Sequence, residues 1–199
     1  MQISILCFDG VDELDVIGPY RVFAGADQAD SPISVVLTTV EPRDHITTSY
    51  GLDIAVHGTI RETDPDILVV PGGGWNSRNA TSAWAEAERG AIPAVISEFH
   101  EEDRIIAGVC TGTMLIERAG ILTGRRAITH AGAVDELQAS DAIVVRERVV
   151  DDGDIVTAGG VTSGIDLALH LLEREFDESR AEAVATNLEY QRQQSIFST

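Results

Sequence analysis

Short runs of aliphatic and β-branched residues alternate with longer amphipathic stretches along this chain of 199 residues. The patterns predict strands at residues 2–8, 33–39, 66–70, 104–109, 126–129, 143–150 and 154–157, and a hairpin at 46–56. They predict helices at residues 18–26, 82–102 with a break near Pro93, 111–119 ending before Gly120, 162–176 and 178–190. Such alternation indicates an α/β fold with a mainly parallel sheet covered on both faces. The length fits a single domain over residues 1–199 better than two.

Three features follow strands or lie in loops at the same predicted edge of this sheet. They are Cys110, the glycines at 72–74 and the loop at 9–18. Ligands of open α/β sheets bind beyond the carboxyl ends of the strands. We therefore expect these three segments to form one site.

Cys110 stands where a buried strand turns into a helix, with small residues on both sides. This is the pattern of a nucleophile elbow, in which a sharp turn exposes the side chain at the end of the sheet. A helix N-terminus next to the sulfur is expected to lower the thiol pKa and favour a thiolate. The alternative is a small buried hydrophobic residue. Cys7, inside the first strand, serves as a control because only packing is expected of it.

Asp15 lies between Leu14 and Val16, in a position where partial burial would raise its carboxyl pKa. A protonated carboxyl next to a thiolate is a hydrogen-bond donor and a general acid. The alternative is an N-cap for the helix after Pro19. Asp12 and Glu13 have the pattern of solvated loop charges.

The glycines at 72–74 match neither a dinucleotide-binding fingerprint nor a P-loop, because the spacing differs and no lysine follows. Gly72 and Gly73 are candidates to present backbone N–H groups, together with that of Thr111, to a developing negative charge. A plain turn is the alternative. Gly160 is a candidate for close approach of the following helix to the site, or for close packing alone.

His130 follows a short strand, and a Cys–His pair is a common nucleophile arrangement. A histidine at a strand end is more often structural, so both readings stay open. The other four histidines show no constellation, and no metal-ligand spacing is present. We expect neither a metal nor a cofactor.

Fourteen arginines, no lysine and 33 acidic residues give a net charge of −19. Such a surface repels nucleic acids and anionic membranes, so neither is an expected partner. The dispersed acidic residues suggest adaptation to high salt, with an ordinary acidic protein as the alternative. Two cysteines and no evident signal peptide or membrane span suggest a cytoplasmic protein with reduced thiols.

Five motifs in order resemble the ThiJ/PfpI superfamily, the cysteine-elbow relatives of class I glutamine amidotransferases. The motifs lie at residues 14–19, 70–73, 109–112, 124–130 and 159–166. The resemblance implies a flavodoxin-like three-layer α/β/α sandwich and a homodimer with sites near its interface. It also implies Cys110 as nucleophile, Asp15 as its proton-donating partner and Thr111 as an assisting residue.

Within this superfamily the chain looks most like the isonitrile hydratase subgroup, which carries Cys-Thr-Gly at the elbow and Asp before Gly-Pro. The protease branch has His directly after the cysteine, where this chain has Thr111. The glyoxalase and deglycase branch typically has Glu at the position of Asp15. One departure is Ala131, where isonitrile hydratases commonly carry a bulky aromatic residue.

The resemblance implies a cofactor-free lyase acting on a small electrophilic molecule, foremost an isonitrile that is hydrated to an N-substituted formamide. A glyoxalase- or deglycase-like enzyme acting on α-oxoaldehydes is the second reading. A redox-sensing or stress-protective protein that oxidises Cys110 is the third.

Overall fold

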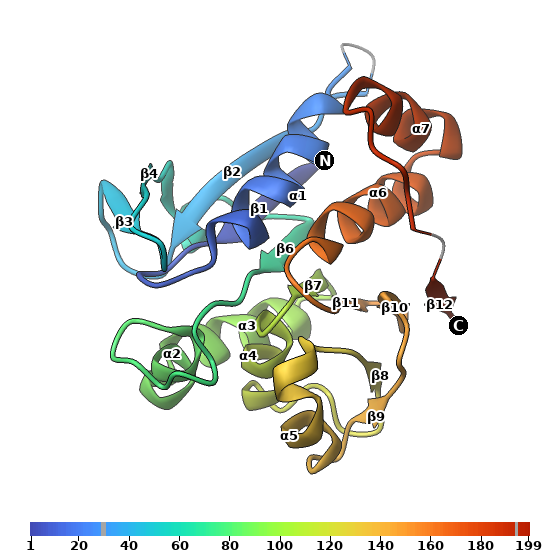
Figure 1. Cartoon of the computed structure of the whole chain (residues 1–199). Helices are drawn as coiled ribbons and strands as arrows, with labels where there is room; N and C mark the ends of the chain where they lie inside the picture. The colour runs from blue at the N-terminus through green and yellow to red at the C-terminus, as the bar shows by residue number, and fades with distance from the viewer. Residues whose placement is uncertain (29–30, 194) are drawn as a thin grey trace.

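The computed structural model describes residues 1–28, 31–193 and 195–199, and its centre is an eight-stranded sheet (Figure 1). In spatial order the strands are β12 (Ile196–Ser198), β10 (Val149–Asp151), β11 (Ile155–Ala158), β7 (Ile105–Val109), β6 (Ile67–Val70), β1 (Gln2–Leu6), β2 (Ser34–Thr39) and β5 (Gly58–Thr59). All neighbours pair in parallel except β10 and β11. The predicted mainly parallel α/β fold is confirmed.

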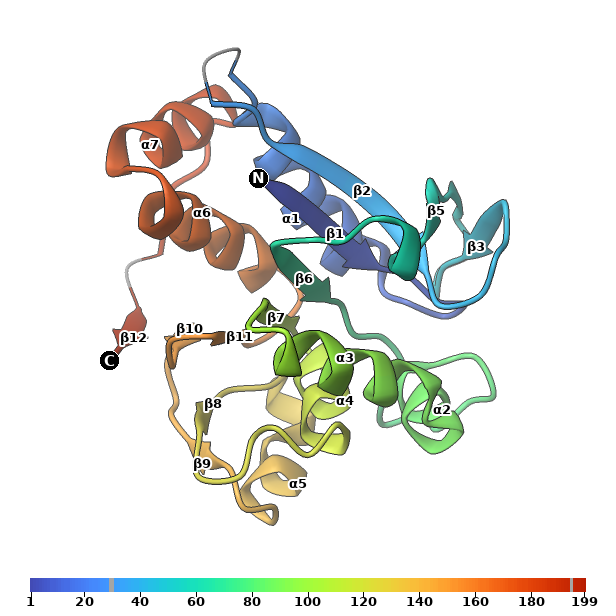
Figure 2. The same ribbon diagram turned by 180° about the vertical axis from the view of Figure 1, so that it is seen from behind.

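Helices cover both faces of this sheet, as the front and back views show (Figures 1 and 2). One group consists of α1 (Glu13–Gly25), α6 (Ser163–Glu175) and α7 (Glu178–Asn187), which pack on one another. The other group consists of α2 (Ala83–Arg89), α3 (Ala91–Glu101) and α4 (Gly112–Arg118). The short helix α5 (Val134–Gln138) lies beside the small parallel pair of β8 (Arg126–Ala127) and β9 (Ile143–Val144).

The two central strands β6 and β7 are apolar along almost their whole length because helices cover them on both sides. Every residue of β6 is at most 1% exposed. Both strands end in turns that lead to the predicted site. The antiparallel pair of β3 (His45–Thr47) and β4 (Asp53–Ala55) confirms the expected hairpin and projects beside the same edge.

Helix α1 begins five residues earlier than predicted, at Glu13 instead of Gly18. The Asp12 side chain caps it by accepting a hydrogen bond from the Leu14 N–H at 3.0 Å, so Asp12 is not a free loop charge. Pro19 therefore lies inside the helix and has no N–H to donate to the carbonyl of Asp15. Asp15 itself belongs to the first turn and is not the N-cap.

Four further elements differ from the prediction. The helical region 82–102 breaks at Gly90, which has a φ of +79°, and Pro93 lies in the first turn of α3, where its missing N–H costs nothing. The predicted strand 143–150 is split between β9 and β10, and the predicted strand 126–129 is reduced to β8. The last predicted helix ends at Asn187 rather than at residue 190. Polar residues between the two short apolar runs explain why the predicted strand 143–150 is split into β9 and β10.

Candidate active site

Cys110 occupies the sharp turn between β7 and α4 with a φ of +56°, a left-handed backbone conformation that is uncommon for a residue with a side chain. Its N–H donates to the Ala158 carbonyl at 3.0 Å, and its carbonyl accepts the Thr129 hydroxyl at 2.9 Å. Gly112 lies so close to β6 that a Cβ there would be 1.9 Å from the Val70 carbonyl oxygen. The strained turn is therefore held from several sides, as expected of a nucleophile elbow.

Asp15 reaches this turn from the first turn of α1 and is fully buried. The Gly72 N–H donates to its Oδ2 at 2.9 Å. Its Oδ1 is buried without a hydrogen-bond partner among the described residues. The Asp15 carboxyl and the Cys110 thiol lie close enough for each to shift the pKa of the other. The two groups that the sequence singled out first thus form a pair.

Burial is the main cause that raises the pKa of Asp15 to about 7, and the nearby Asp12 carboxylate adds to it. The Gly72 N–H and the Cys110 thiol lower it by a smaller amount. Burial, followed by the negative charge of Asp15, also raises the pKa of the Cys110 thiol. At neutral pH the Cys110–Asp15 pair therefore retains at least one proton.

The predicted lowering of the Cys110 pKa by the helix N-terminus is corrected by these contacts. The Thr111 N–H does lower the thiol pKa, but burial and Asp15 outweigh it. A thiolate can form without a second buried negative charge only when Asp15 takes up the proton.

Gly72 and Gly73 do not offer free N–H groups to a ligand in this structure. The Gly72 N–H is bound to Asp15, and the Gly73 N–H donates to Thr111 Oγ1 at 3.0 Å. A Cβ on Gly72 would lie 2.5 Å from the Thr111 nitrogen, so no other residue fits there without movement. These glycines position Asp15 and Thr111, which corrects their expected role as direct oxyanion donors.

His130 lies beside the pocket above Cys110, and its Nδ1 accepts a hydrogen bond from the Gly132 N–H at 3.0 Å. The neutral ring therefore carries its proton on Nε2, which can donate to a ligand but cannot accept a proton from Cys110. Gly160 does not line the pocket. A Cβ at Gly160 would lie 3.5 Å from His130 Cδ2, so this glycine packs against the histidine.

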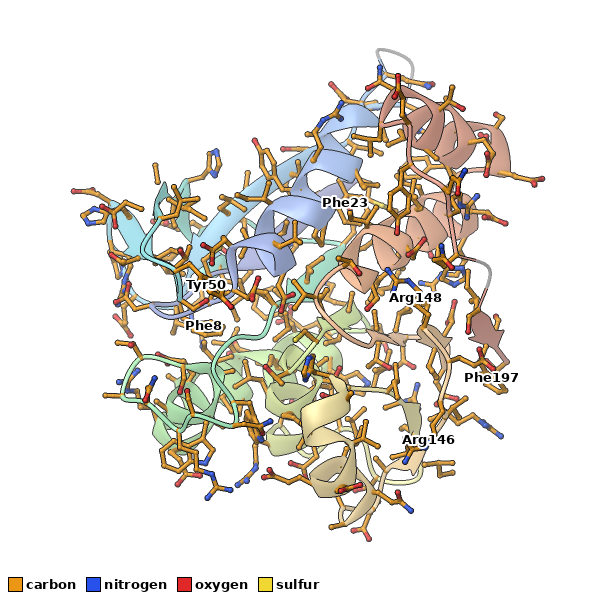
Figure 3. The ribbon with its side chains drawn as sticks, viewed as in Figure 1. Phe8, Phe23, Tyr50, Arg146, Arg148 and Phe197 are labelled. Carbon is orange, nitrogen blue, oxygen red and sulfur yellow. The ribbon has the colours of Figure 1, made fainter. Side chains whose placement is uncertain are left out.

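A pocket of about 270 Å³ opens above the thiol, and Cys110 itself is 5% exposed. Its walls include residues that sequence reasoning missed, namely Asp12, Tyr50, Trp75, Asn76 and Val161. Acidic residues are common in the first turn of a helix, and Glu13 and Asp15 shortly after Asp12 are the sequence signal that could have identified Asp12 as the cap of α1. Tyr50 comes from the hairpin and is 83% exposed (Figure 3), and no local pattern places it near Cys110.

Hydrogen bonds from the loop after β6 hold one wall of this pocket. The Trp75 indole N–H donates to Glu136 at 2.9 Å, and the Asn76 side chain donates to the Gly132 carbonyl at 3.0 Å. Both bonds reach the segment that follows His130. The wall that carries His130 is thereby fixed relative to the glycine loop.

Cys7 behaves as the control that the sequence suggested. It is 2% exposed in the core, and burial raises its pKa to about 12. In the part of the chain that the structure describes, no group of three His, Cys, Asp or Glu side chains is arranged to bind a metal ion. No helix there is both long and apolar enough to cross a membrane.

Comparisons with known proteins bear on the fold and the family of this chain. An isonitrile hydratase of Pseudomonas putida is 35% identical over 96% of this chain and 78% of its own length. A deglycase of Thermococcus kodakarensis is 26% identical over 79% of this chain and 89% of its own length. The crystal structure of a ThiJ/PfpI family protein from Pseudomonas syringae superposes with a TM-score of 0.81 at 27% identity, covering 96% of this chain and 76% of the other. The model of the DJ-1/PfpI family matches residues 1–174, and the chain therefore belongs to the DJ-1/PfpI family.

Proposed function

We propose that the protein is a cysteine-dependent lyase that hydrates an isonitrile to an N-substituted formamide. The observation that carries this proposal is the buried Cys110–Asp15 pair at the base of the pocket. Similarity to the isonitrile hydratase over 96% of the chain supports the choice of substrate.

In the first step the Cys110 proton passes to Asp15 and the sulfur attacks the terminal carbon of the isonitrile. Asp15 returns the proton to that carbon, which gives a thioimidate in which sulfur, hydrogen and the substituted nitrogen are bound to one carbon. Water then adds to the thioimidate carbon, and the C–S bond breaks. The products are the N-substituted formamide and the Cys110 thiol, so atoms and protons balance without a cofactor.

Thr111 and His130 are suited to assist this reaction. The Thr111 hydroxyl accepts from Gly73, so its own hydrogen is available for the substrate nitrogen or the attacking water. The Nε2–H of His130, which also lines this pocket, is available for the same purpose. We assign both residues to substrate binding and not to proton abstraction.

The test is turnover of a simple alkyl isonitrile, followed as formamide production. We expect wild type to be active, Cys110→Ala to be inactive and Asp15→Asn to lose at least about 100-fold, the usual contribution of a general acid. Cys7→Ala is the matched control, since it removes the other buried thiol and leaves the pair intact. Turnover by Cys110→Ala at the wild-type rate would refute the mechanism.

A second candidate reaction is conversion of α-oxoaldehydes, since the deglycase and a fission-yeast glyoxalase, Schizosaccharomyces pombe DJ-1, are also similar to this chain. Lactate production from methylglyoxal with a faster rate than isonitrile hydration would favour it. Redox sensing by Cys110 is less well supported. Sensor cysteines have low pKa values and are accessible, whereas Cys110 is buried and its pKa is raised.

We also propose a cytoplasmic homodimer. Two free thiols fit a reducing compartment. Leu14 and Ile17 on α1, and Tyr50 and Leu52 on the hairpin, are exposed large hydrophobic residues on elements that border the site. Sedimentation of wild type against Ile17→Asp tests the dimer, and a monomeric wild type would contradict it.

A further inference from the structure

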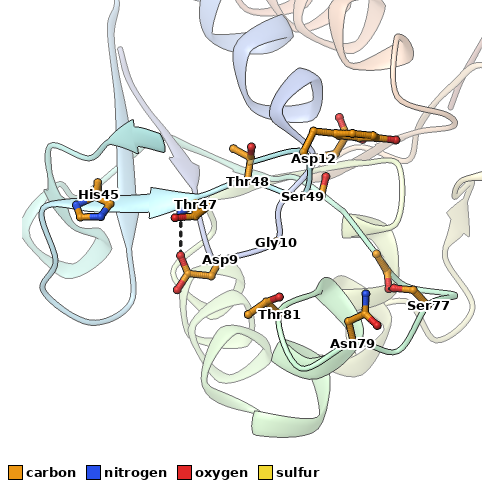
Figure 4. Close-up of a pocket in the computed structure, with 12 residues that line it drawn as sticks. Asp9, Gly10, Asp12, His45, Thr47, Thr48, Ser49, Ser77, Asn79 and Thr81 are labelled. Atoms are coloured by element: carbon orange, nitrogen blue, oxygen red, sulfur yellow. Dashed lines mark hydrogen bonds between the residues drawn. The ribbon is translucent and has the colours of Figure 1, made fainter. Parts of the chain in front are cut away.

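A second and larger cavity adjoins the pocket above Cys110 (Figure 4). We call it the polar groove; it has a volume of about 750 Å³ and lies between the end of β1, the hairpin and the loop after β6. Asp12, Tyr50, Gly74 and Ser77 line both cavities, so the two lie side by side. Together they exceed the space that a small isonitrile or an α-oxoaldehyde needs.

The walls of the polar groove are hydrophilic. Aspartate, threonine, serine and asparagine side chains supply most of the lining, and no aliphatic side chain contributes among the described residues. Thr47 lies on the hairpin beside Asp9, and Thr81 and Asn79 lie on the segment between β6 and α2 (Figure 4). Such a surface does not bind an alkyl group by the hydrophobic effect, but it can satisfy a hydrogen-bonding substituent.

The charge of the polar groove is negative. It contains two carboxylates, of which Asp9 is paired with Arg43 at 2.8 Å. Asp12 accepts the Leu14 N–H and has no ion-pair partner among the described residues. No arginine of the described chain lines the groove, and its basic residue, His45, lies at the end that holds Asp9 and not Asp12 (Figure 4). An anionic substituent is therefore repelled, and a cationic one is attracted to Asp12.

Asp12 also links the polar groove to the chemistry of the pair. Its negative charge opposes ionisation of both Asp15 and Cys110. A cation bound against Asp12 would cancel this repulsion and make the thiolate easier to form. Binding in the groove would thus promote the attack on the reactive carbon.

We propose that the polar groove binds the non-reacting end of the substrate and selects a cationic ammonium group that lies against Asp12. This inference rests on the proposed function for the reactive end only. It defines the substrate class as an electrophile linked to a protonated amine.

The first experiment compares three isonitriles of equal chain length that end in a methyl, an ammonium or a carboxylate group. We expect kcat/KM to be about tenfold higher for the ammonium than for the methyl compound, which corresponds to one favourable charge interaction, and lowest for the carboxylate. In Asp12→Asn the ammonium preference should fall to within about twofold. Asparagine caps helices as well as aspartate does, so α1 is preserved.

Glu13→Gln is the matched control, because it removes the neighbouring acidic charge from a residue that lines neither cavity. It should keep the wild-type preference. Asn79→Lys is a second variant, placed in the polar groove but away from the cysteine pocket, and it should reverse the preference. An unchanged ammonium preference in both Asp12→Asn and Asn79→Lys would overturn the proposal.

The second experiment does not depend on turnover. Methanethiosulfonate reagents with a cationic, neutral or anionic tail transfer their thioalkyl group to the Cys110 sulfur and release methanesulfinic acid. In a Cys7→Ala background we expect the cationic reagent to react fastest, relative to a free thiol, and Asp12→Asn to remove this order. If the cationic reagent reacts fastest but no isonitrile is hydrated, the proposed function is wrong and the assignment of the polar groove stands. If the methyl-terminated isonitrile is hydrated but neither experiment shows a preference for the cationic compound, the assignment of the polar groove is wrong.

Discussion

Replacing Asp15 by asparagine should change how the stability of the protein depends on pH. In the folded protein the Asp15 pKa is about 7, against an ordinary value of 3.8. Between these values the unfolded chain has released the proton while the folded protein still holds it. The unfolded state then binds fewer protons, so the free energy of unfolding falls as pH rises through this interval.

The size of this effect follows from the two pKa values. A pKa difference of one unit corresponds to 1.36 kcal/mol, so the carboxyl group costs the folded protein about 4 kcal/mol once pH exceeds 7. Asparagine does not titrate and avoids this cost. The stability of Asp15→Asn relative to wild type should therefore rise by about 4 kcal/mol between about pH 4 and pH 8, while its activity is lost.

Urea unfolding followed by tryptophan fluorescence measures this difference at each pH. All other titrations occur in both proteins and cancel, so neither the absolute stability nor the lost Gly72 hydrogen bond enters the result. Asp9→Asn is the control with the opposite sign. Burial alone would raise the pKa of Asp9, but the Thr47 N–H and Arg43 lower it overall, so this variant should lose relative stability as pH rises. A pH-independent difference between Asp15→Asn and wild type would refute the assignment of a raised Asp15 pKa.

Three other outcomes are expected. The kcat/KM for isonitrile hydration should rise about tenfold per pH unit below pH 7 and level off above it, because the doubly protonated Cys110–Asp15 pair cannot supply a thiolate. A kcat/KM that falls as pH rises toward 7 would contradict proton transfer within this pair. Gly112→Ala should lower the free energy of unfolding, measured in urea, by more than about 3 kcal/mol, since a Cβ would lie 1.9 Å from a β6 carbonyl oxygen. Gly159→Ala is the control, and it should change the free energy of unfolding by less than about 1 kcal/mol, because its nearest neighbour would be 3.7 Å away. If the acidic surface reflects adaptation to high salt, the melting temperature should rise steadily from about 0.1 M to 2 M KCl, and full stability at low ionic strength would exclude it.

The elbow was predictable from sequence because every part of its signal is local. An apolar run, a cysteine, small flanking residues and an amphipathic stretch lie within about ten residues, and they specify strand, turn and helix in that order. The start of α1 was missed because Pro19 has the pattern of a first-turn residue. Asp12 caps the helix earlier, and tertiary packing then tolerates proline in its interior. The fourth backbone hydrogen bond of the helix is lost there, which no local propensity favours.

The roles of the glycines could not be read from sequence, since they depend on contacts between distant segments. Gly72 and Gly73 follow β6, yet their N–H groups bind the side chains of Asp15 in α1 and of Thr111 directly before α4. The missed hairpin residue Tyr50 is a similar case, because only the folded chain places it above Cys110.

The arrangement around Asp15 has a cost that packing alone does not explain. A fully buried carboxyl with one unpartnered oxygen and a raised pKa destabilises the folded state, and an apolar or amide side chain of similar size would relieve this. Cys110 adds a left-handed backbone conformation at the same point. Two unfavourable features that are electrostatically coupled, each held by hydrogen bonds from separate elements, are typical of residues kept for chemistry. Asp15→Asn should therefore stabilise the protein above pH 7 while lowering turnover strongly. Cys110→Ala should not stabilise it, because alanine keeps the left-handed backbone conformation and the thiol that lowers the Asp15 pKa is lost. The two effects on stability should not add, because the cost of losing the thiol depends on the Asp15 charge. Two additive effects in a double-mutant cycle would show that the residues act independently.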